Sequence, residues 1–492
     1  MAAIAAPSQK KVNAYTWACG LFAAVGSLLY GIDSGIVSTV ISQPTFAMYF
    51  TPFTPSIKGA VVSTFGAGSV FGVFFAGWSA DYLGRKKSIA IGAVIALIAG
   101  IIQAASVHVG MLIAGRIIGG FAVGIMNMTI PIYNSEIAPS HKRGLIAGLH
   151  AQFVGVGFAV AANWVGFGCS YATGSFQWRF LLAFQCLPAL IVLVGIFWLP
   201  YSPRWLLERE RDDEALAVIK RLHGHKGEAY EDIRTEFYQM REQLRFEKSQ
   251  YVAGWSELFT RPSNRKRLIL AVLVQAFTQL SGINVINYYQ TDLYKGLGMS
   301  GHMYLRPCRT SANLICLFYV DTWGRKKTLW ITGIIMTIDM TLVMGLSGGF
   351  VHSNNTVTKG FIIAFIFCFT IIYSLGYNSI HYIYVPEIMS MTIRARGSSI
   401  AIVSNVLINI VFNQVSPIAF AQVGYKYYSL FICTNIVGAA TVFFFFPETK
   451  GKSLEEIGQI FGEDVIVGDL EVVREKAQMK EVEMVERFEE RK

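Results

Sequence analysis

Apolar stretches of about 20 residues follow one another along most of this 492-residue chain, with short polar loops between them. A stretch of that length crosses the hydrocarbon core of a bilayer as an α-helix, because a helix satisfies its own backbone hydrogen bonds. Charged residues make up 15% of the sequence, whereas a soluble protein carries about 25%. We therefore predict an all-α membrane protein. Its twelve transmembrane helices are expected at about 14–36, 58–80, 88–107, 110–133, 144–167, 179–199, 266–290, 303–320, 327–348, 360–383, 397–421 and 427–447.

Two polar patterns occur once in each half of the chain. The first is Asp-x-x-Gly-Arg-Lys-Lys in a loop between two apolar stretches. Its residues are Gly77, Asp81, Gly84 and Arg85 in the first copy and Asp321, Gly324 and Arg325 in the second. The other pattern is a glutamate with an arginine seven positions later, Glu136 with Arg143 and Glu387 with Arg394. This repetition predicts a duplicated molecule of two six-helix halves. Opposite charges at neighbouring helix ends can pair in one conformation and separate in another, so we predict a gating role for these residues.

Basic residues are concentrated in alternate loops, and this asymmetry predicts the orientation of the chain. Loops rich in Lys and Arg stay on the cytoplasmic side, so both termini are expected there and the +10 net charge does not indicate a nucleic-acid partner. The sequon that begins at Asn354 then faces outward. The predicted parts are a cytoplasmic N-terminus at 1–13, a first half at 14–199, cytoplasmic linker helices at 200–265, a second half at 266–447 and a cytoplasmic tail at 448–492.

Catalytic and metal-binding motifs are absent from the sequence. The seven cysteines are scattered and form no Cys-x-x-Cys, and the chain contains no P-loop, Gly-x-Ser-x-Gly or zinc-protease pattern. We therefore expect neither an enzyme nor a protein with a metal or cofactor.

Five motifs carry a resemblance to a known family. One is the Asp-x-x-Gly-Arg-Lys-Lys loop, which occurs twice. The other four are Gly115-Arg116-Ile-Ile-Gly119-Gly120, Ser202-Pro203-Arg204-Trp205, Gln279-Leu-Ser-Gly282-Ile-Asn284-x-x-x-Tyr288-Tyr289 and Pro447-Glu448-Thr449-Lys450-Gly451. Over about 15–460, the chain resembles the sugar porter branch of the major facilitator superfamily. The resemblance implies two six-helix bundles around a cavity that opens alternately to either side. It also implies a secondary transporter of a neutral sugar, expected in the plasma membrane and acting as a monomer.

A sugar site needs side chains that both donate and accept hydrogen bonds, together with aromatic rings for the apolar faces of the sugar. Amides within the predicted spans supply the first kind, and the resemblance places some of them at sugar-contact positions. The predicted substrate-binding residues are Gln152, Gln279, Asn284, Tyr288, Asn405 and Asn409. Polar packing between helices remains an alternative for each amide.

One carboxylate lies within the first predicted span. A charge at membrane depth indicates a functional site, and the expected partner of Asp33 is Arg116 in the fourth span. In the proton-coupled members that the chain resembles, this aspartate carries the proton, so we predict sugar:proton symport. A structural ion pair in a passive facilitator is the alternative.

The sequence also departs from its family. Thr278, Tyr201, Asn378-Ser379 and Tyr382 stand where many members carry other residues, so the sugar itself is left open, and polyols, quinate and disaccharides remain alternatives. The eighth span is truncated: its clean apolar part, 311–320, follows Arg306, Pro307 and Arg309. A short or broken helix is expected there, and with it poor transport, as in a non-functional splice form. A transporter-like nutrient sensor is a further alternative, disfavoured by the short tail.

Overall fold

The computed structural model describes residues 13–41, 43–139, 143–158, 164–224, 237–238, 240–241, 257–287, 323–350, 356–389, 393–450, 457 and 459–462. These residues form helices, turns and loops, with no strand among them. The predicted eighth span, Tyr288, Asp321 and the Asn354 sequon lie outside the described residues, as do the side chains of Arg143 and Arg394. The expectations attached to them therefore stay predictions.

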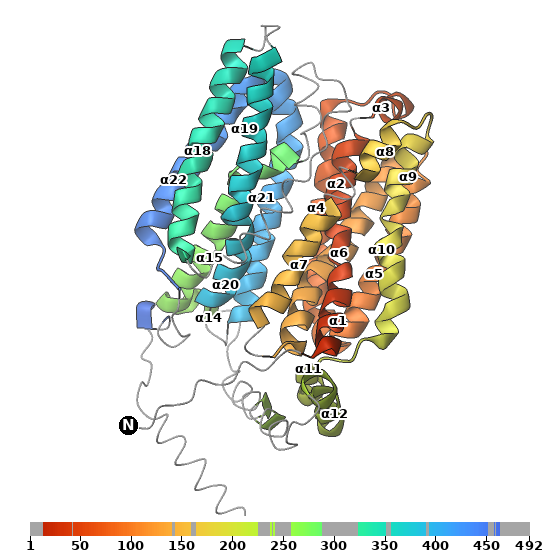
Figure 1. The fold of residues 1–492 in the computed structure, drawn as a ribbon, viewed down its shortest axis with the longest axis vertical. Helices are drawn as coiled ribbons and strands as arrows, with labels where there is room; N and C mark the ends of the chain where they lie inside the picture. Colours follow the sequence, from red (N-terminus) through yellow and green to blue (C-terminus); the bar gives the residue numbers. More distant parts are fainter. Residues whose placement is uncertain are drawn as a thin grey trace, which may run out of the picture.

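The helices form two bundles that stand side by side in Figure 1. The first bundle consists of α1 (Ala14–Val25), α2 (Leu28–Val40), α4 (Pro55–Tyr82), α5 (Arg85–Ala104), α6 (Val109–Ile137), α7 (Arg143–Phe158), α8 (Gly166–Ser170), α9 (Phe176–Phe184) and α10 (Cys186–Gly195). The second consists of α15 (Pro262–Leu280), α18 (Arg325–Phe350), α19 (Thr356–Leu375), α20 (Tyr377–Ile388), α21 (Arg394–Val423) and α22 (Tyr428–Phe445).

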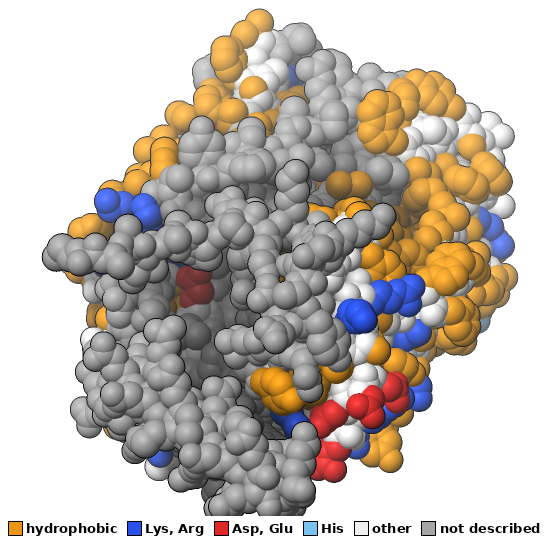
Figure 2. All heavy atoms as spheres, turned by 60° about the horizontal axis from the view of Figure 1, so that its bottom comes forward, with side chains coloured by type: hydrophobic (Ala, Val, Ile, Leu, Met, Phe, Trp, Pro, Cys, Tyr) orange, Lys and Arg blue, Asp and Glu red, His pale blue; other side chains and the backbone are white. Residues whose placement is uncertain are grey.

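Short helices mark the two ends of the molecule. At the top of Figure 1, α3 (Pro44–Tyr49) follows α2, and we refer to this as the α3 end. At the bottom, α11 (Pro203–Glu208) and α12 (Asp212–His223) lie beneath the first bundle, and we refer to this as the α11 end. In Figure 2, which brings the α11 end forward, charged side chains gather at this end and hydrophobic side chains cover the flank.

The flanks of the bundles are apolar enough to face lipid. Nine stretches among the described residues are long and apolar enough to cross a membrane, and one of them, Arg396–Phe445, contains both α21 and α22. Large side chains such as Phe71, Phe74 and Trp78 are 68%, 58% and 56% exposed on α4. Such exposure would favour aggregation in water but suits the hydrocarbon of a bilayer, so the chain is a multi-pass membrane protein.

Local sequence explains several helix boundaries. Thr54 accepts a hydrogen bond from the backbone N–H of Ile57 and precedes Pro55, a combination that favours a helix start. The first span was predicted at 14–36. In the structure it consists of α1 and α2 and extends to Val40. Gly84 and Gly324 both have φ of +87°, which explains why the repeated loop pattern carries a glycine there.

Glycines bring four helices of the first bundle into two close pairs. A Cβ at Gly120 of α6 would overlap the carbonyl oxygen of Phe65, and one at Gly124 would overlap the next turn of α4. In the same way, Gly31 of α2 lies against the carbonyl oxygen of Val154 in α7, and Gly157 of α7 lies against α2. The backbones of α4 and α6, and those of α2 and α7, are therefore in direct contact. Each pair is expected to move as a unit.

The two bundles touch at the α3 end. The Ser63 hydroxyl of α4 donates to Gln414 Oε1 of α21 at 2.8 Å, and a Cβ at Gly59 would lie 2.8 Å from the carbonyl oxygen of Gln414. A buried apolar cluster spans the same end, with Val285, Tyr427 and Phe431 of the second bundle against residues of the first. These contacts hold the two bundles together at the α3 end.

Candidate functional site

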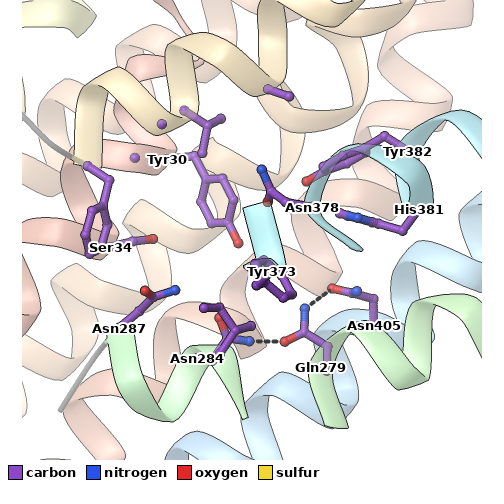
Figure 3. Close-up of a pocket in the computed structure, with 16 residues that line it drawn as sticks. Tyr30, Ser34, Gln279, Asn284, Asn287, Tyr373, Asn378, His381, Tyr382 and Asn405 are labelled. Atoms are coloured by element: carbon purple, nitrogen blue, oxygen red, sulfur yellow. Dashed lines mark hydrogen bonds between the residues drawn. The ribbon is translucent and has the colours of Figure 1, made fainter. Parts of the chain in front are cut away.

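A cavity lies between the two bundles, in the middle of the molecule (Figure 3). From the first bundle, α2 and α7 line it, and from the second bundle, α15 with the helical residues 283–287 that follow it, α19, α20 and α21. Its polar lining residues are Tyr30, Ser34, Gln279, Asn284, Asn287, Tyr373, Asn378, His381, Tyr382 and Asn405. Carboxylates and basic residues other than His381 do not contribute to this lining within the described part of the chain.

Amide side chains of α15 and α21 form a continuous hydrogen-bonded network along one wall of the cavity. Gln279 is its hub: its Nε2 donates to Asn405 Oδ1 at 2.8 Å, and its Oε1 accepts from Asn409 Nδ2 at 3.2 Å and from Asn284 Nδ2. The network continues from Asn405 Nδ2 to Gln275 Oε1 at 2.8 Å. Figure 3 shows Tyr30 approaching this wall from the opposite bundle.

The structure brings most of the predicted substrate-binding residues together. Gln279, Asn284 and Asn405 line the cavity, and Asn409 joins them through its bond to Gln279. Gln152 is buried in α7 but is not a lining residue; its neighbour Ala151 lines the cavity instead. Three of the predicted amides therefore line the cavity, Asn409 is bonded to one of them, and Gln152 lies one helix position from the lining; their role in binding stays a prediction.

Several residues of the cavity lining and of the amide network were not predicted from the sequence. Tyr30 and Ser34 of α2 flank Asp33 in the sequence, and their proximity to that charge was an available signal. Gln275 precedes Gln279 by one helical turn, and Asn413 follows Asn409 by one turn and donates to it at 2.6 Å. Tyr373 carries no signal that separates it from other aromatic residues of an apolar helix.

Asp33 and Arg116 form a buried ion pair next to the cavity. Arg116 Nη1 lies 2.6 Å from both carboxylate oxygens of Asp33. Arg116 is 1% exposed and Asp33 is 3% exposed. The Nε of Arg116 also donates to the carbonyl oxygen of Val61 in α4 at 3.0 Å. Breaking such a buried pair without a proton transfer would leave an unpaired charge in a medium of low dielectric constant. The pair is therefore expected to be most stable with both residues in contact.

Two histidines lie where the two bundles face each other. The Nε2–H of His150 donates to Asn127 Oδ1 at 2.6 Å, and its Nδ1 accepts from the Ser27 hydroxyl at 2.7 Å. His381 Nδ1–H donates to the carbonyl oxygen of Tyr377 at 2.7 Å. The ring of Tyr382 lies 3.9 Å from His381 and 6.2 Å from His150, so it joins α20 to α7. This contact crosses from one bundle to the other beside the cavity.

The repeated polar patterns form one charge network in each bundle at the α11 end. In the first bundle, Arg85 lies 2.9 Å from Glu136, 3.8 Å from Asp81 and 3.5 Å from Glu208 of α11. The indole N–H of Trp205 donates to the carbonyl oxygen of Asp81 at 3.0 Å, which holds α11 against the loop. Burial raises the pKa of the Glu208 carboxyl, with an opposing effect from Arg85.

The second bundle repeats this network with one difference. Arg325 lies 2.9 Å from Glu387, as Arg85 does from Glu136. Glu448 accepts hydrogen bonds from the backbone N–H groups of Arg325 at 2.8 Å and Lys326 at 3.1 Å, so its carboxylate caps α18. The carbonyl oxygens of Pro200 and Pro447 each accept a hydrogen bond from a tyrosine hydroxyl, so the residue after Pro200, Tyr201, corresponds to Glu448 and provides no carboxylate. The four predicted gating residues Arg85, Glu136, Arg325 and Glu387 are therefore paired within their own bundles.

Comparison with known proteins agrees with this architecture. A family model described as "Sugar (and other) transporter" matches residues 19–461. The MFS-type transporter criB of Aspergillus cristatus is 35% identical over 450 residues, which cover 90% of this chain and 92% of the relative. The high-affinity glucose transporter of Kluyveromyces lactis is 30% identical over 469 residues, which cover 91% of this chain and 85% of the relative.

A solved structure shares the fold. The proton:xylose symporter XylE of E. coli, bound to 6-bromo-6-deoxy-D-glucose, superposes with a TM-score of 0.74 and 23% sequence identity. The match covers 91% of this chain and 99% of that one. The two bundles therefore have the arrangement of the major facilitator fold, with its twelve helices in two halves.

Proposed function

Because the chain belongs to the sugar transporter family of the major facilitator superfamily, we propose that it moves a neutral sugar across the plasma membrane by alternating access, coupled to a proton. Membership in this family makes the chain a transporter rather than an enzyme.

The amide network centred on Gln279 is the observation that carries the proposal. Sugar hydroxyls both donate and accept hydrogen bonds, and amide side chains answer both roles without carrying a charge. Aromatic rings of Tyr30, Tyr373 and Tyr382 line the same cavity and can cover the apolar faces of a sugar ring. Among the described residues, the lining contains no carboxylate and no basic residue other than His381, which favours a neutral solute over an ionic one.

The buried Asp33–Arg116 pair supports proton coupling. A carboxylate and a guanidinium at membrane depth are stable together, and the carboxylate can leave its partner at low cost only as the neutral acid. The proteins similar to this chain include a high-affinity glucose transporter and a proton:xylose symporter. A passive facilitator that keeps the pair as a structural element is the competing function.

Alternating access requires that the contacts at the two ends exchange. The seam between α4 and α21 closes the α3 end, and the networks around Arg85 and Arg325 hold each bundle together at the α11 end. We take the α11 end to be cytoplasmic, because the basic loops lie there. Opening the seam while the α11 end closes would present the amide network to the outside.

Uptake of radiolabelled sugars by a yeast strain that lacks its own hexose transporters tests the proposal. The panel comprises D-glucose, D-galactose, D-xylose, myo-inositol and a disaccharide, each with and without a protonophore. We expect saturable uptake of at least one of them, abolished by the protonophore. The Asp33→Asn variant should lose accumulation against a gradient and retain exchange of sugar across the membrane, because it mimics the protonated aspartate. Wild-type uptake that the protonophore leaves unchanged would establish a passive facilitator instead. The absence of uptake for every sugar of the panel would contradict the proposed substrate class.

A further inference from the structure

Phe65 of α4 contacts both a residue of the cavity lining and a member of the Asp33–Arg116 pair. The ring of Phe65 stacks on the ring of Tyr30 with an interplanar angle of 5° and a centroid distance of 6.4 Å. The guanidinium carbon of Arg116 lies over the same Phe65 ring, 4.5 Å from its centroid. Tyr30 lines the cavity, and Arg116 holds Asp33. An unbroken series of contacts therefore leads from the cavity to the buried carboxylate.

We propose that Phe65 couples occupancy of the sugar cavity to the Asp33–Arg116 pair, as a positioning residue for proton transfer. This inference rests on the proposed sugar:proton symport and adds to it the residue through which the two sites communicate.

The guanidinium of Arg116 depends on Phe65 for its position. Its Nη1 binds Asp33 and its Nε binds the carbonyl oxygen of Val61, while its Nη2 is buried without a hydrogen-bond partner among the described residues. The face of an aromatic ring attracts a cation, and the attraction is strongest where water is excluded. Phe65 is 4% exposed and Arg116 is 1% exposed, so the ring supplies a favourable surface for a guanidinium that is not fully hydrogen-bonded.

The arrangement of the helices explains why cavity and ion pair would respond together. Glycine contacts join α4 to α6 and α2 to α7, as described above. Phe65 and Arg116 both belong to the α4–α6 pair, whereas Tyr30 and Asp33 both belong to α2. The Tyr30–Phe65 stack and the Asp33–Arg116 ion pair are thus two contacts across one boundary between helix pairs. A displacement of α2 against α4 and α6 changes both of them.

A sugar that contacts Tyr30 would provide that displacement. Coupling between two sites is reciprocal, so a sugar that favours one position of α2 alters the partner of Asp33, and protonation of Asp33 alters sugar affinity by the same factor. The Phe65 ring transmits the effect because it touches the moving tyrosine and the arginine at once. In a variant without the aromatic ring at position 65, the sugar would still bind. Sugar binding would then no longer position Arg116.

The test compares variants of the full-length protein in the yeast strain and with the panel sugar that wild type accumulates. Two quantities are measured: the protons taken up per sugar, from alkalinisation of the medium, and the exchange of radiolabelled sugar across the membrane at equal concentrations. Phe65→Leu keeps an apolar side chain and removes the ring. We expect its proton-to-sugar ratio to fall by about tenfold, the effect of losing one desolvated cation–π contact, while exchange continues.

Two further variants separate coupling from packing. Replacing Phe65 with pentafluorophenylalanine keeps the shape of the ring and weakens its attraction for a cation, and we expect the same loss of coupling. Phe71→Leu is the matched control, because Phe71 lies on the same helix, is 68% exposed on the flank and should leave the ratio at its wild-type value. Folding of each variant is verified by its amount at the cell surface.

The outcomes distinguish this inference from the proposed function. Wild-type uptake without alkalinisation would overturn symport and the coupling role together. Wild-type alkalinisation with an unchanged ratio in the pentafluorophenylalanine variant would overturn the role of Phe65 alone. The structure predicts a lower proton-to-sugar ratio with continuing exchange in the pentafluorophenylalanine variant. It predicts an unchanged ratio in Phe71→Leu.

Discussion

Truncation of Gln279 to alanine should weaken sugar binding more than any other single amide substitution in the cavity. Gln279 donates to Asn405 and accepts from Asn284 and Asn409, so it orients three other amides. In the empty cavity water can replace these bonds, and the loss of protein stability is expected to be only about 1 kcal/mol. In the Gln279→Ala variant, a bound sugar lacks both the hydrogen-bond donor and the hydrogen-bond acceptor of the Gln279 amide. That loss is worth about 1–3 kcal/mol, or a rise in KM of about 5- to 150-fold.

The assay is the initial rate of radiolabelled uptake over a range of sugar concentrations, with the amount of protein at the cell surface measured in parallel. Gln103→Ala is a matched control, because Gln103 is a fully buried amide that donates to the carbonyl oxygen of Gly115, away from the cavity. We expect this control to reduce the amount of protein and to leave KM unchanged. An unchanged KM in Gln279→Ala at normal surface expression would show that the amides only hold α15 and α21 together, and the assignment of the cavity would be wrong.

Three other perturbations test separate parts of the structure. Burial raises the pKa of Glu208 although Arg85 opposes the shift, so the ionised form destabilises the folded state at neutral pH. Glu208→Gln should therefore raise the thermal stability of the detergent-solubilised protein at pH 7. This gain in stability should vanish as the pH falls through the range in which the Glu208 carboxyl takes up its proton. A lower Tm of the variant at pH 7 would show that the ion pair with Arg85 outweighs burial. Gly59→Trp cannot fit against Gln414 with the seam closed, so uptake should be lost while an impermeant thiol reagent gains access to a cysteine placed in the seam; normal transport would refute a closing role for the seam. Replacing 303–310 with a longer apolar, glycine-containing segment should increase surface expression and uptake, and equal values in the unmodified chain would show that the short eighth span is tolerated.

The charged residues were the most predictable part of the site. A carboxylate or a guanidinium inside an apolar stretch has few ways to be stable, so the sequence restricts the partner of Asp33 to Arg116, and the structure joins them at 2.6 Å. The repeated loop patterns indicated a role for Arg85 and Glu136 without indicating that they pair with each other. Their ion pair links the two motifs of one bundle, and this link depends on how α4, α5 and α6 converge at one end.

The amides were predictable as a class but less well as individual positions. Gln279, Asn405 and Asn409 stand out because amides are rare in apolar helices, and their network forms because α15 packs against α21. Gln152 has the same chemical character, yet it lies beside the cavity wall, since a change of one position on a helix turns a side chain by about 100°. Helix rotation about its own axis is set by packing, which the periodicity of an almost uniformly apolar helix does not encode.

Phe65 gave no signal in the sequence at all. The chain contains 35 phenylalanines, and those that the structure describes include exposed side chains such as Phe71 and Phe74 and buried ones such as Phe46 and Phe369. Its position between Tyr30 and Arg116 results from glycine contacts between α4 and α6, which bring a backbone carbonyl of Phe65 against Gly120. Such a role is visible only when the side chains are placed in three dimensions.

Concentrative uptake by the purified protein in liposomes tests the central claim most directly, because it excludes metabolism and other transporters. Vesicles containing the protein are diluted into a medium that makes their interior alkaline, and a radiolabelled sugar of the panel is added outside. Coupled transport through the cavity predicts accumulation above the outside concentration, its collapse on addition of a protonophore, and mere equilibration in vesicles that contain Asp33→Asn. Equilibration without accumulation in wild-type vesicles would contradict proton coupling, and the absence of any sugar movement would contradict the assignment of the cavity as a sugar site.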